Sequence, residues 1–139
     1  MANIHFFSEG ISFKFPHPIK TAKWLKKVAS KEGRNIESLT YILCSDDFLK
    51  SLNKQFLNHS TYTDILSFDT SEGDRIEGEI YISIPRVREN AKKFGQSFDQ
   101  ELRRVVVHGL LHFLGHQDKT IQQKTQMRIK EEACLSLWK

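Results

Sequence analysis

The chain has 139 residues, of which 39% are hydrophobic and 27% are charged, and it carries a net charge of +4. This length suits a single domain over residues 1–139 with a sizeable core. The lack of a basic N-terminal leader and of any run of about 18 apolar residues predicts a cytoplasmic protein without a membrane segment. The charge favours polyanionic partners only weakly, and two cysteines are too few for a disulfide framework.

The first half of the chain alternates between strand and helix patterns. β-forming residues cluster in 3–15, which predicts a short edge strand or a hairpin. Apolar residues recur at helical spacing in 18–33, between a proline that can start a helix and a glycine that can end it. Residues 39–44 form an apolar run typical of a buried strand, and Ser45 or Asp46 can cap the helix that follows.

The second half contains a predicted hairpin and three predicted helices. Residues 65–83 hold two β-forming runs around a polar turn, which predicts the hairpin. A helix that begins with a proline follows in 85–95, and Ser97 with Gln100 has the spacing of a capping box at the start of the next helix. A closing helix is predicted over 120–138. Its residues available for packing are Met127, Ile129, Ala133, Leu135 and Leu137.

The segment HGLLHFLGHQD, residues 108–118, holds three potential metal ligands. His108 and His112 are four residues apart, so on a helix they share one face and can direct their ring nitrogens at one ion. Gly115 follows where the helix would end, because glycine adopts the left-handed conformation that lets the chain turn back. Asp118 then occupies the position of the third histidine of the metzincin pattern, and a carboxylate is an acceptable zinc ligand. The alternative is that both histidines are ordinary half-buried helix residues.

His116 is the alternative third ligand. It falls in the turn directly after Gly115, so less chain is available to bring its ring back toward the two helical histidines. We therefore rank Asp118 first and expect His116 to orient a ligand or to contact substrate. Three protein ligands with an open fourth position are the arrangement of a catalytic zinc site.

Three blocks of the sequence have the order and spacing of a known family: TDILSF at 63–68, GEIYIS at 78–83 and the histidine segment at 108–118. Through these blocks the chain resembles the YbeY family, in which they read TDVLSF, GDI-x-IS and HGxLHLxGYDH. The resemblance implies an α+β fold, with a central mixed sheet of about four strands flanked by helices. It also implies a metal site on a helix and the loop following it.

The resemblance also implies a function. Family members are bacterial metal-dependent endoribonucleases implicated in ribosomal RNA maturation, so we expect cleavage of single-stranded RNA, 3′ end maturation of 16S rRNA and a role in ribosome quality control. The implied partners are rRNA and the small ribosomal subunit. The implied cofactor is one Zn²⁺ per chain, bound by His108, His112 and Asp118, which would polarise a phosphoryl oxygen and lower the pKa of bound water.

The chain departs from the family pattern at two places. Asp118 stands where the family has its third histidine, so the identity of the ligands needs a test. In the segment before TDILSF the family tends to carry an arginine after an aromatic residue, whereas here Phe56 is followed by Leu57. His59 lies two residues further on and could take part of the role proposed for that arginine in catalysis or phosphate binding.

Three other polar residues are weaker candidates for the site. Arg104 on the metal helix could bind phosphate. Asp64 and Glu79 could orient ligands or serve as a general base. For each of these three the alternative is an ordinary solvated position or a loop cap.

Three competing functions fit parts of the same motif. A minimal zinc protease would need a general-base glutamate directly after the first histidine, but Gly109 stands there. A mononuclear iron oxygenase would use two histidines and a carboxylate as a facial triad. A ribosome-associated assembly factor would hold a structural metal without nuclease activity, and the missing arginine favours this third alternative.

Overall fold

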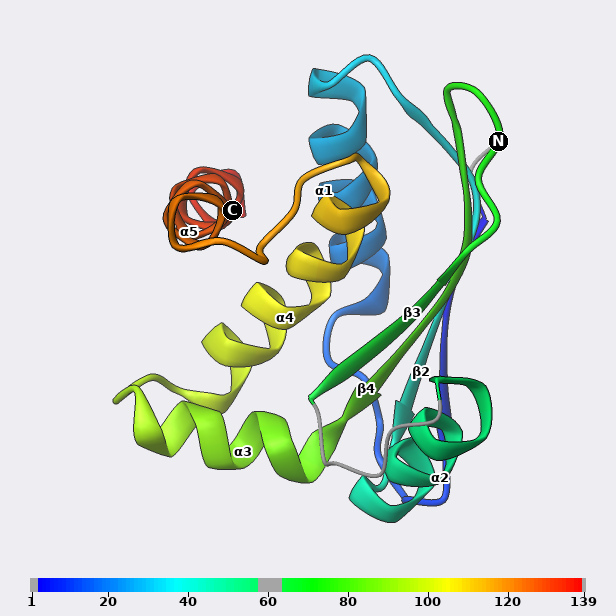
Figure 1. Cartoon of the computed structure of the whole chain (residues 1–139), viewed down its shortest axis with the longest axis vertical. Helices are drawn as coiled ribbons and strands as arrows, with labels where there is room; N and C mark the ends of the chain where they lie inside the picture. Colours follow the sequence, from blue (N-terminus) through cyan, green and yellow to red (C-terminus); the bar gives the residue numbers. More distant parts are fainter. Residues whose placement is uncertain (1–2, 58–63, 139) are drawn as a thin grey trace.

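A four-stranded mixed sheet in the order β1-β2-β4-β3 forms the centre of the computed structural model, which describes residues 3–57 and 64–138 (Figure 1). The two inner strands are β2 (Asn35–Cys44) and β4 (Arg75–Ser83), and they run parallel to each other. The edge strand β1 (Asn3–Glu9) is parallel to β2, and the other edge strand β3 (Ile65–Asp69) is antiparallel to β4. The α+β fold with a mixed sheet of four strands is therefore confirmed.

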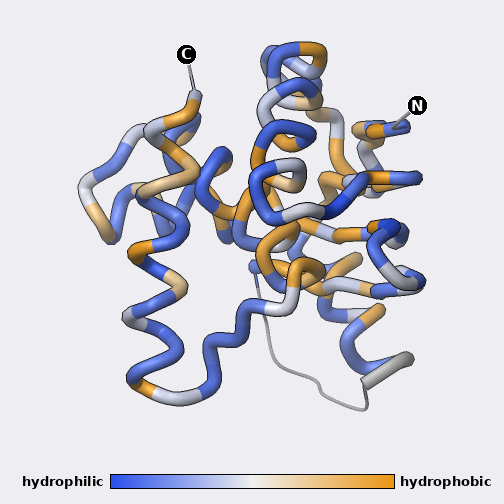
Figure 2. The backbone as a smooth tube through the Cα atoms, turned by 90° about the horizontal axis from the view of Figure 1, so that it is seen from above, coloured by the Kyte–Doolittle hydropathy of each residue, from blue (hydrophilic) through white to orange (hydrophobic). Residues whose placement is uncertain are grey.

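Helices cover the two faces of this sheet unequally. The main core lies between the sheet and the helices α1 (Pro18–Lys31) and α4 (Phe98–Phe113), with α3 (Ile84–Lys93) and α5 (Ile121–Leu135) packed against α4 (Figure 1). A smaller cluster on the opposite face joins α2 (Asp46–Leu57) to side chains of β2, β3 and β4. Hydrophobic segments accordingly gather in the middle of the molecule, and hydrophilic segments lie outside (Figure 2). None of the helices within the described residues is long and apolar enough to cross a membrane.

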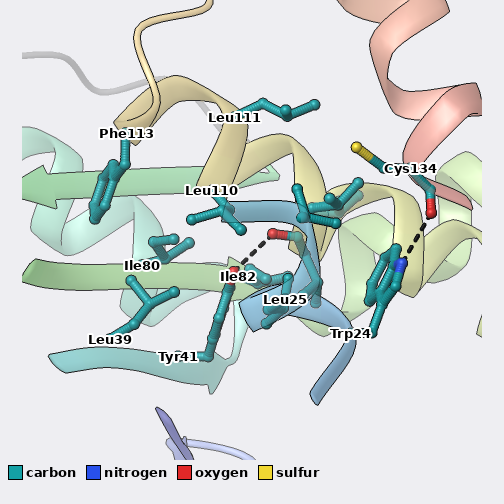
Figure 3. Close-up of a cluster of buried hydrophobic side chains, with 14 of the residues drawn as sticks. Trp24, Leu25, Leu39, Tyr41, Ile80, Ile82, Leu110, Leu111, Phe113 and Cys134 are labelled. Carbon is teal, nitrogen blue, oxygen red and sulfur yellow. Dashed lines mark hydrogen bonds between the residues drawn. The ribbon is translucent and has the colours of Figure 1, made fainter. Parts of the chain in front are cut away.

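Two buried polar side chains tie the layers of the main core together (Figure 3). The Tyr41 hydroxyl on β2 donates a hydrogen bond of 2.8 Å to the backbone carbonyl of Val106 on α4. The Trp24 indole on α1 donates one of 2.8 Å to the carbonyl of Cys134 on α5. Since a buried polar group that lacks a partner is costly, these bonds fix how each helix is placed over the sheet.

Helix α4 is anchored at its start and along one face. Ser97 accepts a hydrogen bond from the backbone N–H of Gln100, and the Gln100 side chain accepts one from the N–H of Ser97, both 3.2 Å long. The predicted capping box is thus confirmed. The face of α4 toward the sheet buries its apolar side chains, and this burial sets the direction of its remaining polar stripe.

The structure decides one alternative among the expected elements and corrects one detail. Of the two alternatives for residues 3–15, the short edge strand is confirmed as Asn3–Glu9, and after Gly10 the chain packs Phe15 on Phe6 (ring centroids 4.0 Å apart) without pairing as a second strand. On α5, Ile129 is 57% exposed and Ala133 is also exposed, so neither packs as expected. The predicted hairpin of β3 and β4 is confirmed.

Candidate metal centre

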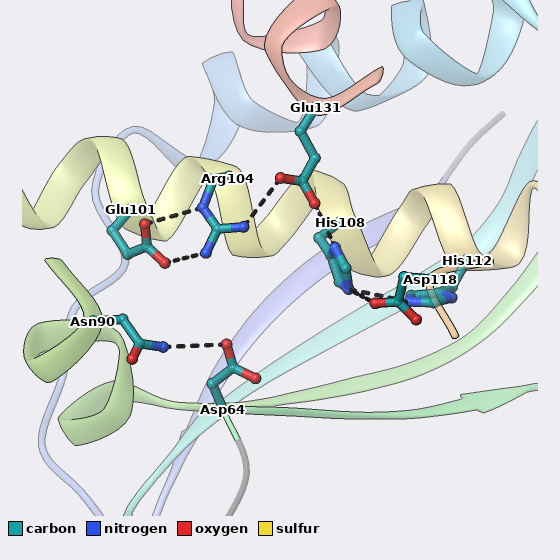
Figure 4. Close-up of polar contacts among 8 residues, drawn as sticks. All are labelled: Asp64, Asn90, Glu101, Arg104, His108, His112, Asp118 and Glu131. Atoms are coloured by element: carbon teal, nitrogen blue, oxygen red, sulfur yellow. Dashed lines mark hydrogen bonds and ion pairs between the residues drawn. The ribbon is translucent and has the colours of Figure 1, made fainter. Parts of the chain in front are cut away.

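Three side chains from α4 and the loop after it meet at one point (Figure 4). His108 and His112 lie on one face of α4, and their Nε2 atoms are 3.0 Å apart. Asp118 Oδ2 lies 3.3 Å from Nε2 of His108 and 3.5 Å from Nε2 of His112. Among the described residues, this is the group of histidine, cysteine and acidic side chains that could hold a metal ion.

The loop that carries Asp118 is short and held at both ends. Gly115 has a φ of +100°, and its N–H donates a hydrogen bond of 3.0 Å to the carbonyl of His112. The N–H of His116 donates a hydrogen bond of 3.0 Å to the carbonyl of Leu111, so the last turn of α4 ends in a glycine C-cap. Thr120 then caps α5 through a second capping box. Asp118 is therefore placed between two capped helix ends.

The spacing of the three donor atoms fits a tetrahedral metal ion. Ligand atoms about 2.0–2.1 Å from a tetrahedral zinc ion lie about 3.4 Å from one another. The observed separations of 3.0, 3.3 and 3.5 Å bracket this value. Burial, and then the neighbouring His108, lower the pKa of His112 below its ordinary value, so its ring is neutral at pH 7 and keeps a lone pair for a metal.

A buried carboxylate from α5 orients the first of the two histidines. Glu131 is 2% exposed, and its Oε2 lies 2.5 Å from Nδ1 of His108. Burial by itself would raise the pKa of Glu131, but the hydrogen bond with His108 and the charge of Arg104 lower it overall, so the carboxylate is ionised. An ionised carboxylate only accepts hydrogen bonds, so Nδ1 of His108 carries the proton and Nε2 presents its lone pair to His112 and Asp118.

Arg104 extends this contact into a buried chain of charges. Its Nη1 donates a hydrogen bond of 3.0 Å to Oε1 of Glu131 (Figure 4). Its Nε donates one of 3.0 Å to Oε1 of Glu101, and its Nη2 donates another to Oε2 of Glu101. Glu101 is 1% exposed. The guanidinium of Arg104 is therefore paired with two buried carboxylates and supports the His108 side of the site, and its contact with phosphate stays a prediction.

Comparisons with known proteins show the family of this chain. A sequence model described as "Endoribonuclease YbeY" matches residues 11–139. The chain belongs to the endoribonuclease YbeY family. A relative named "Endoribonuclease YbeY" from Cytophaga hutchinsonii is 46% identical over 98% of this chain and 96% of its own length. Another of the same name from Christiangramia forsetii is 43% identical over 97% of this chain and 94% of its own length. A solution structure from Thermotoga maritima, 30% identical, superposes with a TM-score of 0.65 over 97% of this chain and 91% of that one.

His116 lies apart from the three donors in this member of the YbeY family. Its Nε2 is 2.8 and 3.0 Å from the two carboxylate oxygens of Glu32, in the segment that ends α1. The ring therefore ties the metal loop to α1, and the three-residue group contains Asp118 in its place. Its contact with substrate stays a prediction.

The other candidate residues lie away from the three donors. Asp64, directly before β3, accepts a hydrogen bond of 3.4 Å from the Asn90 side chain of α3 (Figure 4). Glu79 is exposed on the face of the sheet that α2 covers, where it accepts 3.3 Å from the Tyr81 hydroxyl, so it cannot orient ligands on the α4 face. His59 and the side chain of Leu57 lie outside the described residues.

Sequence reasoning missed Glu131, although the chain holds a signal for it. Met127, Glu131 and Cys134 recur at the spacing of one helix face, and all three are buried on α5. A carboxylate on the packing face of a helix needs a charged or hydrogen-bonded partner. Histidine ligands of metals commonly donate their second ring N–H to such a carboxylate. Together these two rules point from Glu131 to the histidine motif.

Proposed function

We propose that this chain is a metal-dependent endoribonuclease that cuts single-stranded RNA in ribosomal RNA processing. The observation that carries the proposal is the set of three donor atoms 3.0–3.5 Å apart in a chain of the YbeY family. The proposal extends to zinc as the ion, to 3′ end maturation of 16S rRNA and ribosome quality control, to the small ribosomal subunit as partner and to the cytoplasm as location. Family resemblance supports these finer points.

The residues of the site support a catalytic rather than a structural ion. His112 and Asp118 have side chains 32% and 35% exposed, so the group opens to solvent on one side, as a catalytic site requires. A bound ion there would act as a Lewis acid toward phosphate and would acidify water. Glu131 holds the His108 ring in the tautomer and orientation that this role needs, and Arg104 keeps Glu131 in place.

The structure gives a reason against the protease alternative. A Cβ built on Gly109 would lie 2.9 Å from Cδ1 of Ile80 and 3.1 Å from Cδ1 of Ile65, so position 109 faces the sheet. A general-base glutamate at this position would have no room and would not face the metal group. The assembly-factor and iron-oxygenase alternatives are separated by the measurements below.

The first test measures metal content and RNA cleavage together. Wild type, His112→Ala, Asp118→Ala and His116→Ala would be analysed for bound metal after purification without added metal. We expect one metal ion per chain in the wild type and in His116→Ala, and its loss from the other two variants. Cleavage of single-stranded RNA should fall at least roughly a hundredfold with the loss of the ion.

Three outcomes would change the proposal. A wild type that binds no metal would overturn the hydrolase, and bound metal without any RNA cleavage would favour the assembly factor. Cleavage that required oxygen and iron would favour the oxygenase, whereas full activity with zinc under argon excludes it. Metal loss in His116→Ala with retention in Asp118→Ala would reverse the ranking of the third ligand.

A further inference from the structure

A surface hollow of about 310 Å³ opens beside the metal group, between α4 and α5. His108 and Asp118 line it on one side, and Lys124 and Arg128 line it on the other. Lys124 and Arg128 are four residues apart on α5, so both project from the same face of the helix, and both are exposed. A polyanion held at the metal group would meet these two cations first.

A second hollow, of about 390 Å³, continues the first along α4 and α5. The two hollows share Arg104 and Arg128, and the second extends to Phe94 and Trp138. We call the two hollows together the α4–α5 groove. Phe94, which caps the C-terminal end of α3, lines the groove at its far end.

Aromatic rings with cations beside them mark that far end. Phe94 is 46% exposed, and the guanidinium carbon of Arg128 lies 5.9 Å from its ring centroid. The guanidinium carbon of Arg103 lies 4.9 Å from the Trp138 ring. A groove that combines cations for the backbone with rings on which bases stack is the usual means of binding single-stranded nucleic acid without sequence preference.

The buried charges of the groove, one arginine and two carboxylates, sum to −1, and Lys124 and Arg128 are its exposed cations. The two buried carboxylates of Glu101 and Glu131 outweigh the single charge of Arg104, so this buried group adds no positive charge for a phosphate. Lys124 and Arg128 remain available to phosphates at the surface, opposed by the exposed carboxylate of Glu132 in the same groove. They also offer positive charge beside the site in a chain where leucine replaces the arginine expected at position 57.

We propose that the α4–α5 groove binds the single-stranded RNA that leaves the metal centre, with Lys124 and Arg128 on its phosphates and Phe94 under a base. This inference rests on the proposed function and adds to it the path of the substrate. Because phosphates and ring faces are common to all sequences, the groove would favour single strands over duplexes without selecting a sequence.

The test measures binding separately from cleavage. Fluorescence anisotropy would follow a fluorescein-labelled oligouridylate as it binds to protein that carries His112→Ala, so that the probe stays intact. We expect the double variant Lys124→Gln/Arg128→Gln to weaken RNA binding about tenfold. The slope of log affinity against log salt concentration should become less steep by about 1.4, because each of the two lost phosphate contacts accounts for about 0.7. Phe94→Leu should weaken binding about fivefold with the slope unchanged, because stacking releases no counterions.

Matched controls separate the groove from general charge. The control carries Lys54→Gln on α2 and Arg88→Gln on α3, which remove one lysine and one arginine outside the groove. The guanidinium carbon of Arg88 lies 5.2 Å from the Phe98 ring centroid. RNA affinity of this control should stay within about twofold of the parent. Glu132→Gln should tighten binding, because it removes a negative charge from the groove. Circular dichroism would confirm that each variant is folded.

The outcomes distinguish the groove from the function itself. If the Lys124 and Arg128 variants bind like the controls while the metal-loaded wild type still cuts RNA, the groove is wrong and the nuclease stands. If the metal-loaded wild type neither binds nor cuts RNA, the proposed function fails first. A uniform loss in the groove variants and in the controls would also overturn the groove, since it would show only the effect of net charge.

Discussion

Glu131 is the residue that connects the metal group to the hydrophobic core. It accepts from His108 on one oxygen and from Arg104 on the other, while almost wholly buried between α4 and α5. Two buried charges with one hydrogen-bonded histidine form a network in which every member depends on the others. The orientation of a metal ligand is thus set by the packing of a helix that carries no ligand itself.

Replacing Glu131 by glutamine should destabilise the protein by about 2–4 kcal/mol at neutral pH. The amide nitrogen would face one of two donors, Arg104 or His108, and that donor would lose its acceptor. Because the folded pKa of Glu131 is lowered from 4.5, its stabilisation is present above that pH and is lost as the pH falls through the folded value. The stability lost in Glu131→Gln should therefore be largest above pH 4.5 and shrink as the pH falls below it.

Thermal unfolding of metal-free protein between roughly pH 3 and pH 7 measures this dependence. Glu132→Gln is the matched control, because the neighbouring carboxylate is exposed and its removal should change stability by less than about 0.5 kcal/mol. If Glu131→Gln loses the same amount of stability at all pH values, the effect comes from packing and not from the ionised carboxylate.

At the scale of elements, the position of α4 depends on two glycines on opposite sides of its contact with the sheet. Gly109 on the helix leaves room for Ile80 and Ile65, and Gly78 on β4 leaves room for Phe113. A Cβ at position 78 would lie 2.3 Å from the backbone oxygen of Phe68 and 2.7 Å from Cε2 of Phe113. The helix that carries both histidines can approach the hairpin only because neither glycine has a side chain.

We expect Gly78→Ala to destabilise the protein by about 3 kcal/mol or more, and Gly109→Ala by about 1 kcal/mol. The difference follows from what each new methyl group meets. At position 78 it meets a backbone carbonyl of the paired strand, which cannot move without breaking the ladder, whereas at 109 it meets terminal methyl groups that can turn aside. Urea unfolding of the two variants measures both values, and equal costs would contradict this explanation.

At the scale of the whole molecule, the two thiols report on different parts of the fold. Cys44 is fully buried at the end of β2, where burial, then the carboxylates of Asp46 and Glu9, raise its pKa to about 12. Cys134 lies on the buried face of α5, against the main core, and burial raises its pKa to about 11. Because the thiolate is the reactive form, both thiols should be inert in the folded protein.

We expect neither thiol to react with a disulfide reagent at about pH 8 until the protein unfolds. In mild denaturant both should then react at one common rate, because the Trp24 hydrogen bond and the Glu131 contacts hold α5 to the rest of the core. Mass spectrometry of the labelled peptides measures the two rates. A faster reaction of Cys134 would show that α5 opens by itself, and with it the support of His108.

Local pattern was sufficient for most elements and for part of the site. The hairpin, the Ser97 capping box and the placement of His108 and His112 on one helix face depend on residues close in sequence, whose geometry follows from backbone periodicity. The return of Asp118 to these histidines also follows from a glycine C-cap within the same segment. These contacts span few residues, so the chain order alone specifies them.

Tertiary structure decided the partners that lie far apart along the chain. Glu131 contacts His108, and Arg104 is paired with two carboxylates. His116 contacts Glu32, and Glu79 lies on the face of the sheet away from α4. Each of these contacts depends on how helices pack over the sheet, which is set by the fit of buried side chains rather than by any local spacing. The sequence by itself therefore determined which ligands could meet, and only the packing of α5 and α1 against α4 determined what orients them.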